Sequence, residues 1–361
     1  MGVGMLYPHP LDYIVGMKYH LTDLGVKKEF RISSETFQVE ELIDLTKYGF
    51  TVNKTGYAVL KVVKKNIDTF ETMRKLSKIL DIPSSNILFM GLKDKNALSI
   101  SYFFINHQFI DQRMFPVINK DFSISLLGFI KRKPRKSMHI ANKFVIKLPE
   151  MSENEKDVLK RISKLMISIG LPSYYGYQRF GTIRYNTHLL GKYVILGRED
   201  LFSMELLKSM YISEERFSRR MCGDFEDLFY EKIYTSRLHI MSDKVLGFSK
   251  NIYIDAYASY LYNLLINMVI KTTGYTLLNR PLPMPGCLNY MKYYEKICKK
   301  EGLTTYHLTL MPCFMRNGLF YPFDVKIYET NEGVFYTFYL KPGMYATVVL
   351  REIFKEYLRL N

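Results

Sequence analysis

This chain has no long apolar run: none of its 361 residues falls in a stretch approaching the ~18 apolar positions of a transmembrane helix. Residues 1–20 lack the basic start and apolar stretch of a secretory signal. Cysteine is scarce, with four residues and no C-x-x-C pair, so we expect neither a zinc site nor a disulfide framework. These absences favour the cytoplasm, where thiols stay reduced, and exclude membrane insertion.

Acidic residues are few relative to basic ones. Lys and Arg total 51 and Asp and Glu total 35, which gives a formal net charge of +16. Such a charge favours a phosphate-rich partner, with a membrane surface as the competing polyanion. Tryptophan is absent, but 29 Tyr and 24 Phe are present, and aromatic rings interleaved with basic residues are suited to stacking on nucleic-acid bases. We expect most of these rings in the core.

Cofactor motifs are missing as well. The sequence contains no G-x-x-x-x-G-K-[ST], G-x-G-x-x-G or H-E-x-x-H, and its seven histidines show no metal-ligand spacing. We therefore expect no small-molecule cofactor and no metal site.

Among the features that are present, the segment around Asp94 is the most informative. Apolar runs over residues 86–90 and 98–105 predict two strands, so Asp94 should lie on a turn at strand ends, where catalytic groups are often placed. Lys93 and Lys95 would keep it ionised. On spacing alone, a solvated turn with a surface ion pair is the commoner case. A metal-dependent nuclease would need clustered carboxylates, and Asp94 is the only one in this loop.

Periodicity predicts a mixed α/β chain of one large or two domains. Asp68 should cap a helix that ends before Pro83, and Ser152 with Glu155 forms a capping box before a helix over about 153–169. Residues 31–45 should form a strand pair, and residues 321–328 and 334–340 two further strands. Between these regions the chain becomes more helical, with a buried helix over 254–271 and a proline-rich loop over 281–286.

Six segments resemble, in order, motifs of the TruD family of tRNA pseudouridine synthases of archaeal type. They are Phe37–Glu41, Gly91–Ala97, Asn142–Phe144, Tyr174–Gly181, Ala256–Asn263 and Gly343–Glu352. The resemblance implies an α+β fold, with a mixed-sheet catalytic core formed by residues 1–181 plus 316–361. A more helical, TRUD-type domain would be inserted as residues 182–315.

The resemblance also implies a reaction: a cytoplasmic isomerase that converts a uridine in tRNA to pseudouridine through an aspartate nucleophile, without a cofactor. Uridine 13 is the expected target, and uridine 35 of tyrosine tRNA is the alternative. A non-catalytic RNA-binding protein of the same fold is a further alternative, and protein partners are not predicted.

By the same resemblance, Asp94 would be the nucleophile, Phe144 would stack on the extruded uracil, and Asn142 would orient the aspartate or the base. Residues two apart on a strand share a face, so Asn142 and Phe144 could point into one pocket. Without the family, Phe144 is more often a core residue.

Four further positions follow from matched motifs. Phe37 and Glu41 fit F-x-V-x-E, and Arg31 stands where the family carries a basic residue. Glu41 could anchor Arg31 or Lys93 near the aspartate, and a buried structural ion pair is an equal alternative.

A run of five cations in six residues precedes Asn142 and predicts contacts with the RNA backbone, although such runs usually form a solvated face. It consists of Lys131, Arg132, Lys133, Arg135 and Lys136. The chain also departs from the family pattern, with Ser99 and Ser101 replacing Thr and Gln of A-x-T-x-Q and Ser173 replacing Asn. These differences bear on which RNA and which uridine are recognised.

Overall fold

The computed structural model describes residues 6–91, 96–182, 184–207 and 251–360. The chain divides into two compact units, each assembled from separate stretches of sequence. Unit 1 takes Met1–His9, His20–Leu171 and Phe320–Asn361, and unit 2 takes Pro10–Tyr19 and Pro172–Leu319. Unit 2 therefore contains residues 182–315, the span expected as an insertion, together with residues on either side of it.

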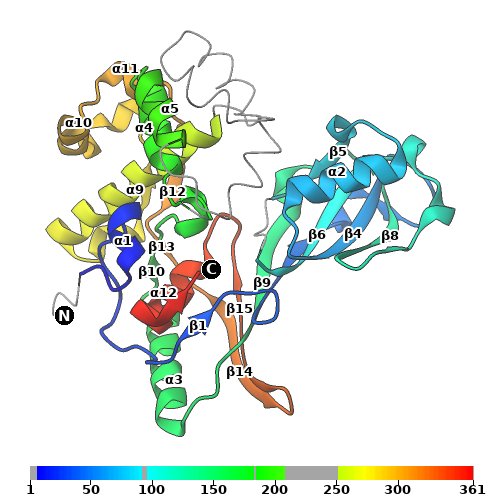
Figure 1. Ribbon diagram of the computed structural model, residues 1–361, viewed down its shortest axis with the longest axis horizontal. Coiled ribbons are helices and arrows are strands. Elements are labelled where there is room, and N and C mark those ends of the chain that lie inside the picture. The colour runs from blue at the N-terminus through cyan, green and yellow to red at the C-terminus, as the bar shows by residue number, and fades with distance from the viewer. Residues whose placement is uncertain (1–5, 92–95, 183, 208–250, 361) are drawn as a thin grey trace. The chain divides into compact units, whose positions relative to one another are not determined.

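Unit 1 is built around a mixed sheet that has ten strands in the part of the chain that the structure describes (Figure 1). Neighbours along its main path follow the order β14-β15-β9-β2-β6-β4-β8-β3, while β5 pairs with β6 and β7 with β8. The bounds are β2 Phe37–Ile43, β3 Phe50–Thr51, β4 Tyr57–Lys65, β5 Ile87–Phe89, β6 Leu98–Asn106, β7 Val117–Ile118, β8 Phe122–Ile130, β9 His139–Lys147, β14 Phe323–Thr330 and β15 Gly333–Leu340. Strands β2 and β6 are parallel, and the other paired strands are antiparallel.

Helix α2, Thr69–Leu80, forms as its local signals predict. The Asp68 side chain accepts a hydrogen bond from the Glu71 backbone N–H at 2.7 Å, which satisfies one of the free donors of the first turn. Leu76 and Leu80 then pack into a buried cluster with apolar side chains of β4, β6 and β8. This burial holds α2 across that half of the sheet (Figure 1).

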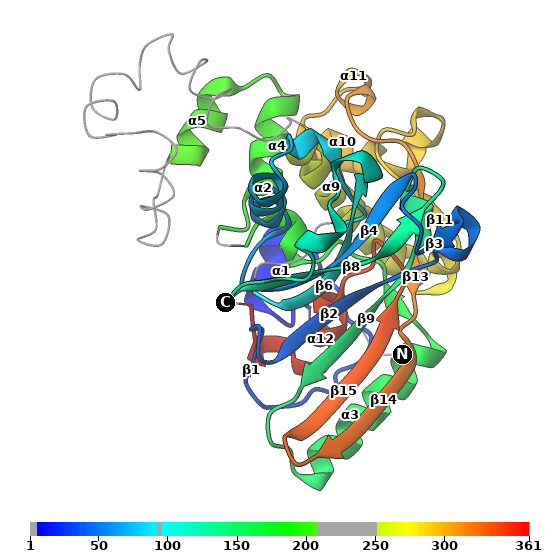
Figure 2. The same ribbon diagram turned by 90° about the vertical axis from the view of Figure 1, so that its right-hand side faces the viewer.

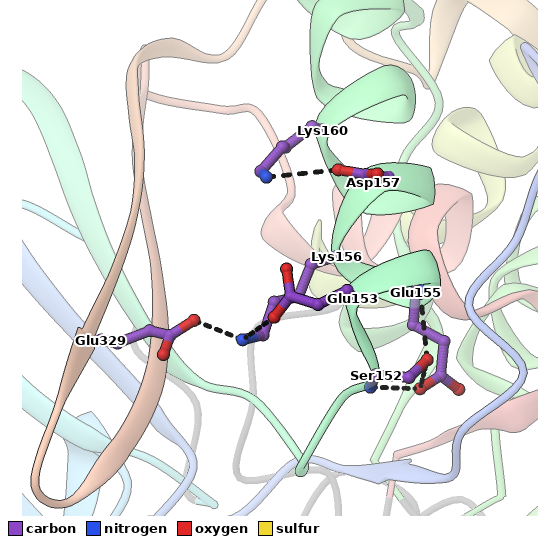
Figure 3. A network of polar contacts seen from close by, with 7 residues as sticks. All are labelled: Ser152, Glu153, Glu155, Lys156, Asp157, Lys160 and Glu329. Atoms are coloured by element: carbon purple, nitrogen blue, oxygen red, sulfur yellow. Dashed lines mark hydrogen bonds and ion pairs between the residues drawn. The ribbon is translucent and has the colours of Figure 1, made fainter.

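Helix α3, Glu153–Ser168, confirms the predicted capping box. The Ser152 hydroxyl and the Glu155 carboxylate each accept a hydrogen bond from the other residue's backbone N–H (Figure 3). Further along the helix, the Ser163 and Tyr336 hydroxyls lie 3.1 Å apart, and Lys156 pairs with Glu329 of β14. These contacts fasten α3 to the β14–β15 half of the sheet.

Helix α12, Ala346–Phe354, is buried along its whole length. Beside it, β1 (Phe30–Arg31) pairs in parallel with β16 (Leu358–Arg359). The prediction that residues 31–45 form a strand pair is therefore wrong. Strand β1 pairs with β16, whereas β2 belongs to the ten-stranded sheet. The described part of unit 1 also contains short 3₁₀ helices at Thr46–Tyr48, Ser84–Asn86, His107–Phe109, Gln112–Met114, Lys136–Met138 and Lys355–Tyr357.

Unit 2 is mainly helical in its described part. Its elements are α1 Pro10–Val15, α4 Thr187–Ile195, α5 Glu199–Leu207, α9 Asn251–Thr273, α10 Glu295–Glu301, α11 Thr305–Thr309, β11 Pro281–Pro283, β12 Met315–Asn317 and 3₁₀ helices at Tyr177–Phe180, Thr276–Asn279 and Leu288–Tyr293. The predicted buried helix is confirmed as α9, whereas the expected proline-rich loop begins with β11, which pairs with β12. Strands β10 (Leu171–Pro172) and β13 (Leu319–Phe320) lie where the chain passes between units.

Asn263, the last residue of the motif segment Ala256–Asn263, is a buried polar residue of α9 whose amide nitrogen and oxygen both form hydrogen bonds. Its amide nitrogen donates to the carbonyls of Val15 and Tyr175, and its oxygen accepts from the Tyr175 backbone N–H at 2.8 Å. Gly191 lets helix α4 pack closely on the same helix. A Cβ at this position would lie only 1.9 Å from the Tyr253 carbonyl oxygen.

The expectation of no disulfide is wrong for one pair of cysteines. Cys287 and Cys313 form a disulfide, with their Cα atoms 4.5 Å apart. The two residues follow β11 and precede β12, so strand pairing brings together positions 26 residues apart. Spacing along the sequence gives no sign of this proximity, which depends on the fold.

Candidate active site

Strand register places several predicted site residues side by side at the centre of the sheet. Between β2 and β9, Glu41 lies opposite Asn142 and Val39 opposite Phe144. Between β2 and β6, Val39 lies opposite Ser99. Laterally paired residues point to the same face, so these side chains share the face that α2 and α3 cover, which we call the helix-covered face.

Phe144 lies in a column of aromatic rings on this face. Its ring centroid is 5.1 Å from that of Phe338 in a stacked arrangement, and 5.7 Å from that of Phe37 in a tilted one. The side chain is 6 % exposed. Phe37 and Phe144, named from separate motifs, are therefore brought into contact, and Phe338 is a third ring that the motifs did not indicate.

The polar members of the site lie next to these rings. Glu41 is fully buried, and its Oε2 accepts a hydrogen bond from the Tyr102 backbone N–H at 3.1 Å. Asn142 Oδ1 lies 3.0 Å from His139 Nε2. Burial raises the pKa of the Tyr102 hydroxyl, and the carboxylates of Glu40 and Glu41 act in the same direction. A carboxylate fixed on a backbone amide and an amide fixed on an imidazole give this part of the sheet defined donors and acceptors.

Two hydroxyls and a lysine extend the polar group across β6 and β4. Ser99 lies opposite Lys64 and Ser101 opposite Val62, all on the helix-covered face. The Ser99 and Ser101 hydroxyls are buried, and neither has a hydrogen-bond partner in the part of the chain that the structure describes. Lys64 is 1 % exposed, and its Nζ donates to the Ile67 carbonyl at 2.6 Å. The sequence analysis did not identify Lys64 as a buried residue. The one signal for its burial was its position two residues after Val62, on the same face of an apolar strand.

One predicted residue lies away from this group, and two cannot be placed. Asp94 and Lys93 lie outside the described residues. Arg31 belongs to β1 rather than to the ten-stranded sheet; its side chain is 63 % exposed and its Nη2 lies 3.9 Å from Glu29 Oε1. The expected pairing of Glu41 with Arg31 or Lys93 stays a prediction, because Lys93 lies outside the described residues.

The basic segment lies between β8 and β9. All five of its predicted cations, Lys131, Arg132, Lys133, Arg135 and Lys136, are exposed. The backbone N–H groups of residues 131 and 132 donate to the Tyr48 carbonyl, and the Arg132 guanidinium donates to the Lys47 carbonyl. These bonds place exposed Lys47 beside the segment, a basic residue that the sequence run did not include.

Within the described ranges, no group of three or more His, Cys, Asp or Glu side chains is arranged to hold a metal ion. In the same ranges, no helix has both the length and the apolar character needed to cross a membrane.

The overall fold matches that of a solved protein. A crystal structure of TruD from Methanosarcina mazei superposes with a TM-score of 0.61 at 20 % identity, covering 95 % of this chain and 97 % of that one. The fold is therefore that of a pseudouridine synthase of this type, as the α+β prediction implied.

Sequence comparison gives the family itself. The profile described as tRNA pseudouridine synthase D (TruD) matches residues 14–284. A "Probable tRNA pseudouridine synthase D" of Saccharolobus solfataricus is 28 % identical over 96 % of this chain and 98 % of its own length. The corresponding protein of Archaeoglobus fulgidus is 27 % identical over 95 % and 99 %. The chain belongs to the tRNA pseudouridine synthase D (TruD) family, a family of isomerases.

Proposed function

We propose that this protein isomerises uridine 13 of tRNA to pseudouridine in the cytoplasm. The observation that carries the proposal is the strand register that groups Glu41, Asn142 and Phe144 on one face of the central sheet, in a chain of the TruD family. Both the residue types and their proximity fit a site that must hold a flat, polar base.

The reaction balances without a co-reactant. The bond between N1 of uracil and C1′ of ribose breaks, the base turns, and a bond forms between C5 and C1′. C5 loses its proton and N1 gains one. We assign the role of nucleophile to Asp94, since a carboxylate can form and release the covalent intermediate that such a transfer needs.

The other residues would bind and orient the substrate. The target base must leave the tRNA stack. Phe144 offers a ring for stacking, supported from behind by Phe338, and Asn142 offers amide groups for the base edge or for Asp94. Phe37, Glu41 and Lys93 complete the proposed substrate-binding group, and Arg31 would contact the substrate from β1, outside the ten-stranded sheet. The basic segment with Lys47 would hold the phosphate backbone.

We also propose that residues 182–315 are an inserted domain in a catalytic core of residues 1–181 and 316–361. The helical character of the described part of unit 2 supports this division.

Tritium release from [5-³H]uridine in unmodified tRNA tests the reaction. Wild type should release tritium and Asp94→Asn should not, while Asp157→Asn, which alters an exposed carboxylate on α3, should behave as wild type. Equal release from wild type and Asp94→Asn would remove Asp94 as nucleophile. Tight tRNA binding with no release from wild type would instead indicate a non-catalytic RNA-binding protein.

Position mapping then tests the target. A transcript with cytidine at position 13 should lose all tritium release. Release that persists there, and is abolished by replacing uridine 35 in tyrosine tRNA, would move the assignment to the anticodon.

A further inference from the structure

The sheet has a second face at β14, β15 and β9, opposite the helix-covered face. Along β15, buried Tyr336, Phe338 and Leu340 point to one side of the sheet. Half-buried Phe335 and Tyr339 point to the other side, with buried Thr337 between them. Because successive side chains of a strand point to opposite sides, Phe335 and Tyr339 face away from α3. Figure 2 views these strands with α3 drawn behind them.

Register assembles an ordered group of side chains on this face. Tyr339 lies between Phe323 of β14 and Lys143 of β9, and Phe335 lies between Tyr328 of β14 and Lys147 of β9. We call this group the lysine–aromatic face. It consists of Phe323, Tyr328, Phe335, Tyr339, Lys143 and Lys147.

The rings on this face form two stacked pairs. Phe323 and Tyr339 have centroids 5.6 Å apart at 25°, and Tyr328 and Phe335 have centroids 5.5 Å apart at 13°. Phe323 is 43 % exposed and Tyr328 42 %. Along β15 the two pairs are four positions apart, a distance of ~13 Å. Cross-strand pairing stabilises the hairpin, but it does not account for how much of each outer ring remains in water.

Two lysines of β9, Lys143 and Lys147, lie beside these rings. Neither Lys143 nor Lys147 has a side-chain hydrogen bond or ion pair to any part of the chain that the structure describes. The nearby acid on β2 is Glu40, which lies opposite Lys143. On β14, Lys326 is matched by Asp324 at 2.9 Å and adds no net charge.

We propose that the lysine–aromatic face binds single-stranded RNA. Bases would stack on the two ring pairs, and the ammonium groups of Lys143 and Lys147 would contact the intervening phosphates. An exclusively apolar protein partner would gain nothing from the two lysines of β9 that flank the rings. This binding goes beyond the proposed isomerisation, because it uses the face opposite Phe144 and needs no chemical step.

The test is the fluorescence anisotropy of a labelled twelve-nucleotide oligouridine. Phe323→Ala combined with Tyr328→Ala should weaken binding about tenfold or more, because each stacked base contributes substantially to affinity. Lys143→Gln with Lys147→Gln should reduce the magnitude of the slope of log affinity against log salt by about 1.4, for two phosphate contacts to a single strand. Phe109→Ala, which removes a ring of equal exposure elsewhere in unit 1, should leave both quantities unchanged.

Conservative variants separate binding from folding. Tyr328→Phe and Lys143→Arg should retain wild-type affinity, while a loss of affinity matched by a lower melting temperature in the alanine variants would overturn the proposal. Unchanged affinity and salt slope in folded variants would also overturn it. So would a wild-type dimer in sedimentation that dissociates on Tyr328→Ala, since the face would then belong to a second copy. Tritium release is measured separately, so failure of the proposed reaction would leave this result standing.

Discussion

At the scale of single residues, buried ionisable groups determine how the fold responds to substitution and to pH. Glu352 and Lys355 form an ion pair at 2.6 Å that is almost fully buried. His188 is buried in unit 2, with its ring stacked on Tyr260. Each of these groups was taken out of water on folding, so each depends on the partners that surround it.

Replacing Glu352 should strongly destabilise unit 1. Its two carboxylate oxygens also accept hydrogen bonds from the backbone N–H groups of Leu21 and Thr22. Burial lowers the pKa of Lys355, and Glu352 acts against that shift. Glu352→Gln leaves the ammonium buried without its counter-charge, so urea unfolding should show a loss of about 3–5 kcal/mol. The exposed Glu356→Gln is the matched control and should change little; equal losses in both would contradict this account.

Protonation of His188 should destabilise the fold in acid. Burial lowers the pKa of His188 from 6.5 to about 4, against the effect of its hydrogen bond to the Ile14 backbone. The unfolded chain therefore binds the proton first, and the penalty grows as pH falls from 6.5 to 4. It should reach about 3 kcal/mol. His188→Phe keeps a ring beside Tyr260, so the difference in unfolding free energy between wild type and variant should change over this pH range. A difference that stays constant would refute the assignment.

Replacing Phe144 should separate stacking on the substrate from packing in the core. Phe144→Leu keeps an apolar side chain but removes the ring face, so the kcat of tritium release should fall about tenfold or more. Phe338→Leu removes the neighbouring ring and should cost similar stability, since both side chains are buried. It should nevertheless retain most of the activity. Equal kcat losses in the two variants would assign Phe144 to the core alone.

At the scale of elements, local signals predicted structure wherever the cause was local. The Asp68 cap and the Ser152–Glu155 box lie next to the helices that they begin, so α2 and α3 could be located from sequence. The pairing of β1 with β16 joins residues more than three hundred positions apart and leaves no local pattern. Burial of Lys64 also depends on neighbouring strands.

The same distinction holds for the site. Alternation along β9 was enough to place Asn142 and Phe144 on one face. The contact of Phe144 with Phe338, and the position of Arg31 outside the sheet, depend on strand order. Strand order is set by packing of the whole unit, which no single motif encodes.

The β11–β12 region gives a prediction about thiols. The chain has four cysteines, of which Cys287 and Cys313 are joined. Protein denatured without reductant should therefore show two free thiols by Ellman titration, and four after reduction. The Cys287→Ser variant should show three without reductant, since Cys313 is released. A titre of four in unreduced wild type would show that the pair is not oxidised.

At the scale of the whole molecule, the net charge of +16 sets a background attraction to any polyanion. Direct contacts between basic side chains and phosphates would add to this background attraction. The salt dependence of tRNA binding can show how much the basic segment between β8 and β9 contributes.

Neutralising the basic segment should lower the salt dependence of tRNA binding without abolishing it. With Lys131, Arg132, Lys133, Arg135 and Lys136 changed to Gln, the slope of log affinity against log salt should shrink by about 0.7–0.9 for each phosphate that the segment no longer neutralises. Lys160→Gln with Lys164→Gln on α3 gives the change expected from net charge alone. If the reduction in slope per removed cation is the same in the two sets of variants, the basic segment does not contact the RNA directly.

The position of β15 has a consequence for synthesis. This strand completes the sheet between β9 and β14, yet it begins at Gly333, long after β9 ends at Lys147. At ordinary translation speeds, the ribosome needs roughly 10–40 s to cover that interval. During that time the β9 edge beside Phe144 has no permanent neighbour in the nascent chain. Ribosome-bound chains stalled before residue 333 should therefore recruit chaperones that chains stalled after full emergence of β15 do not.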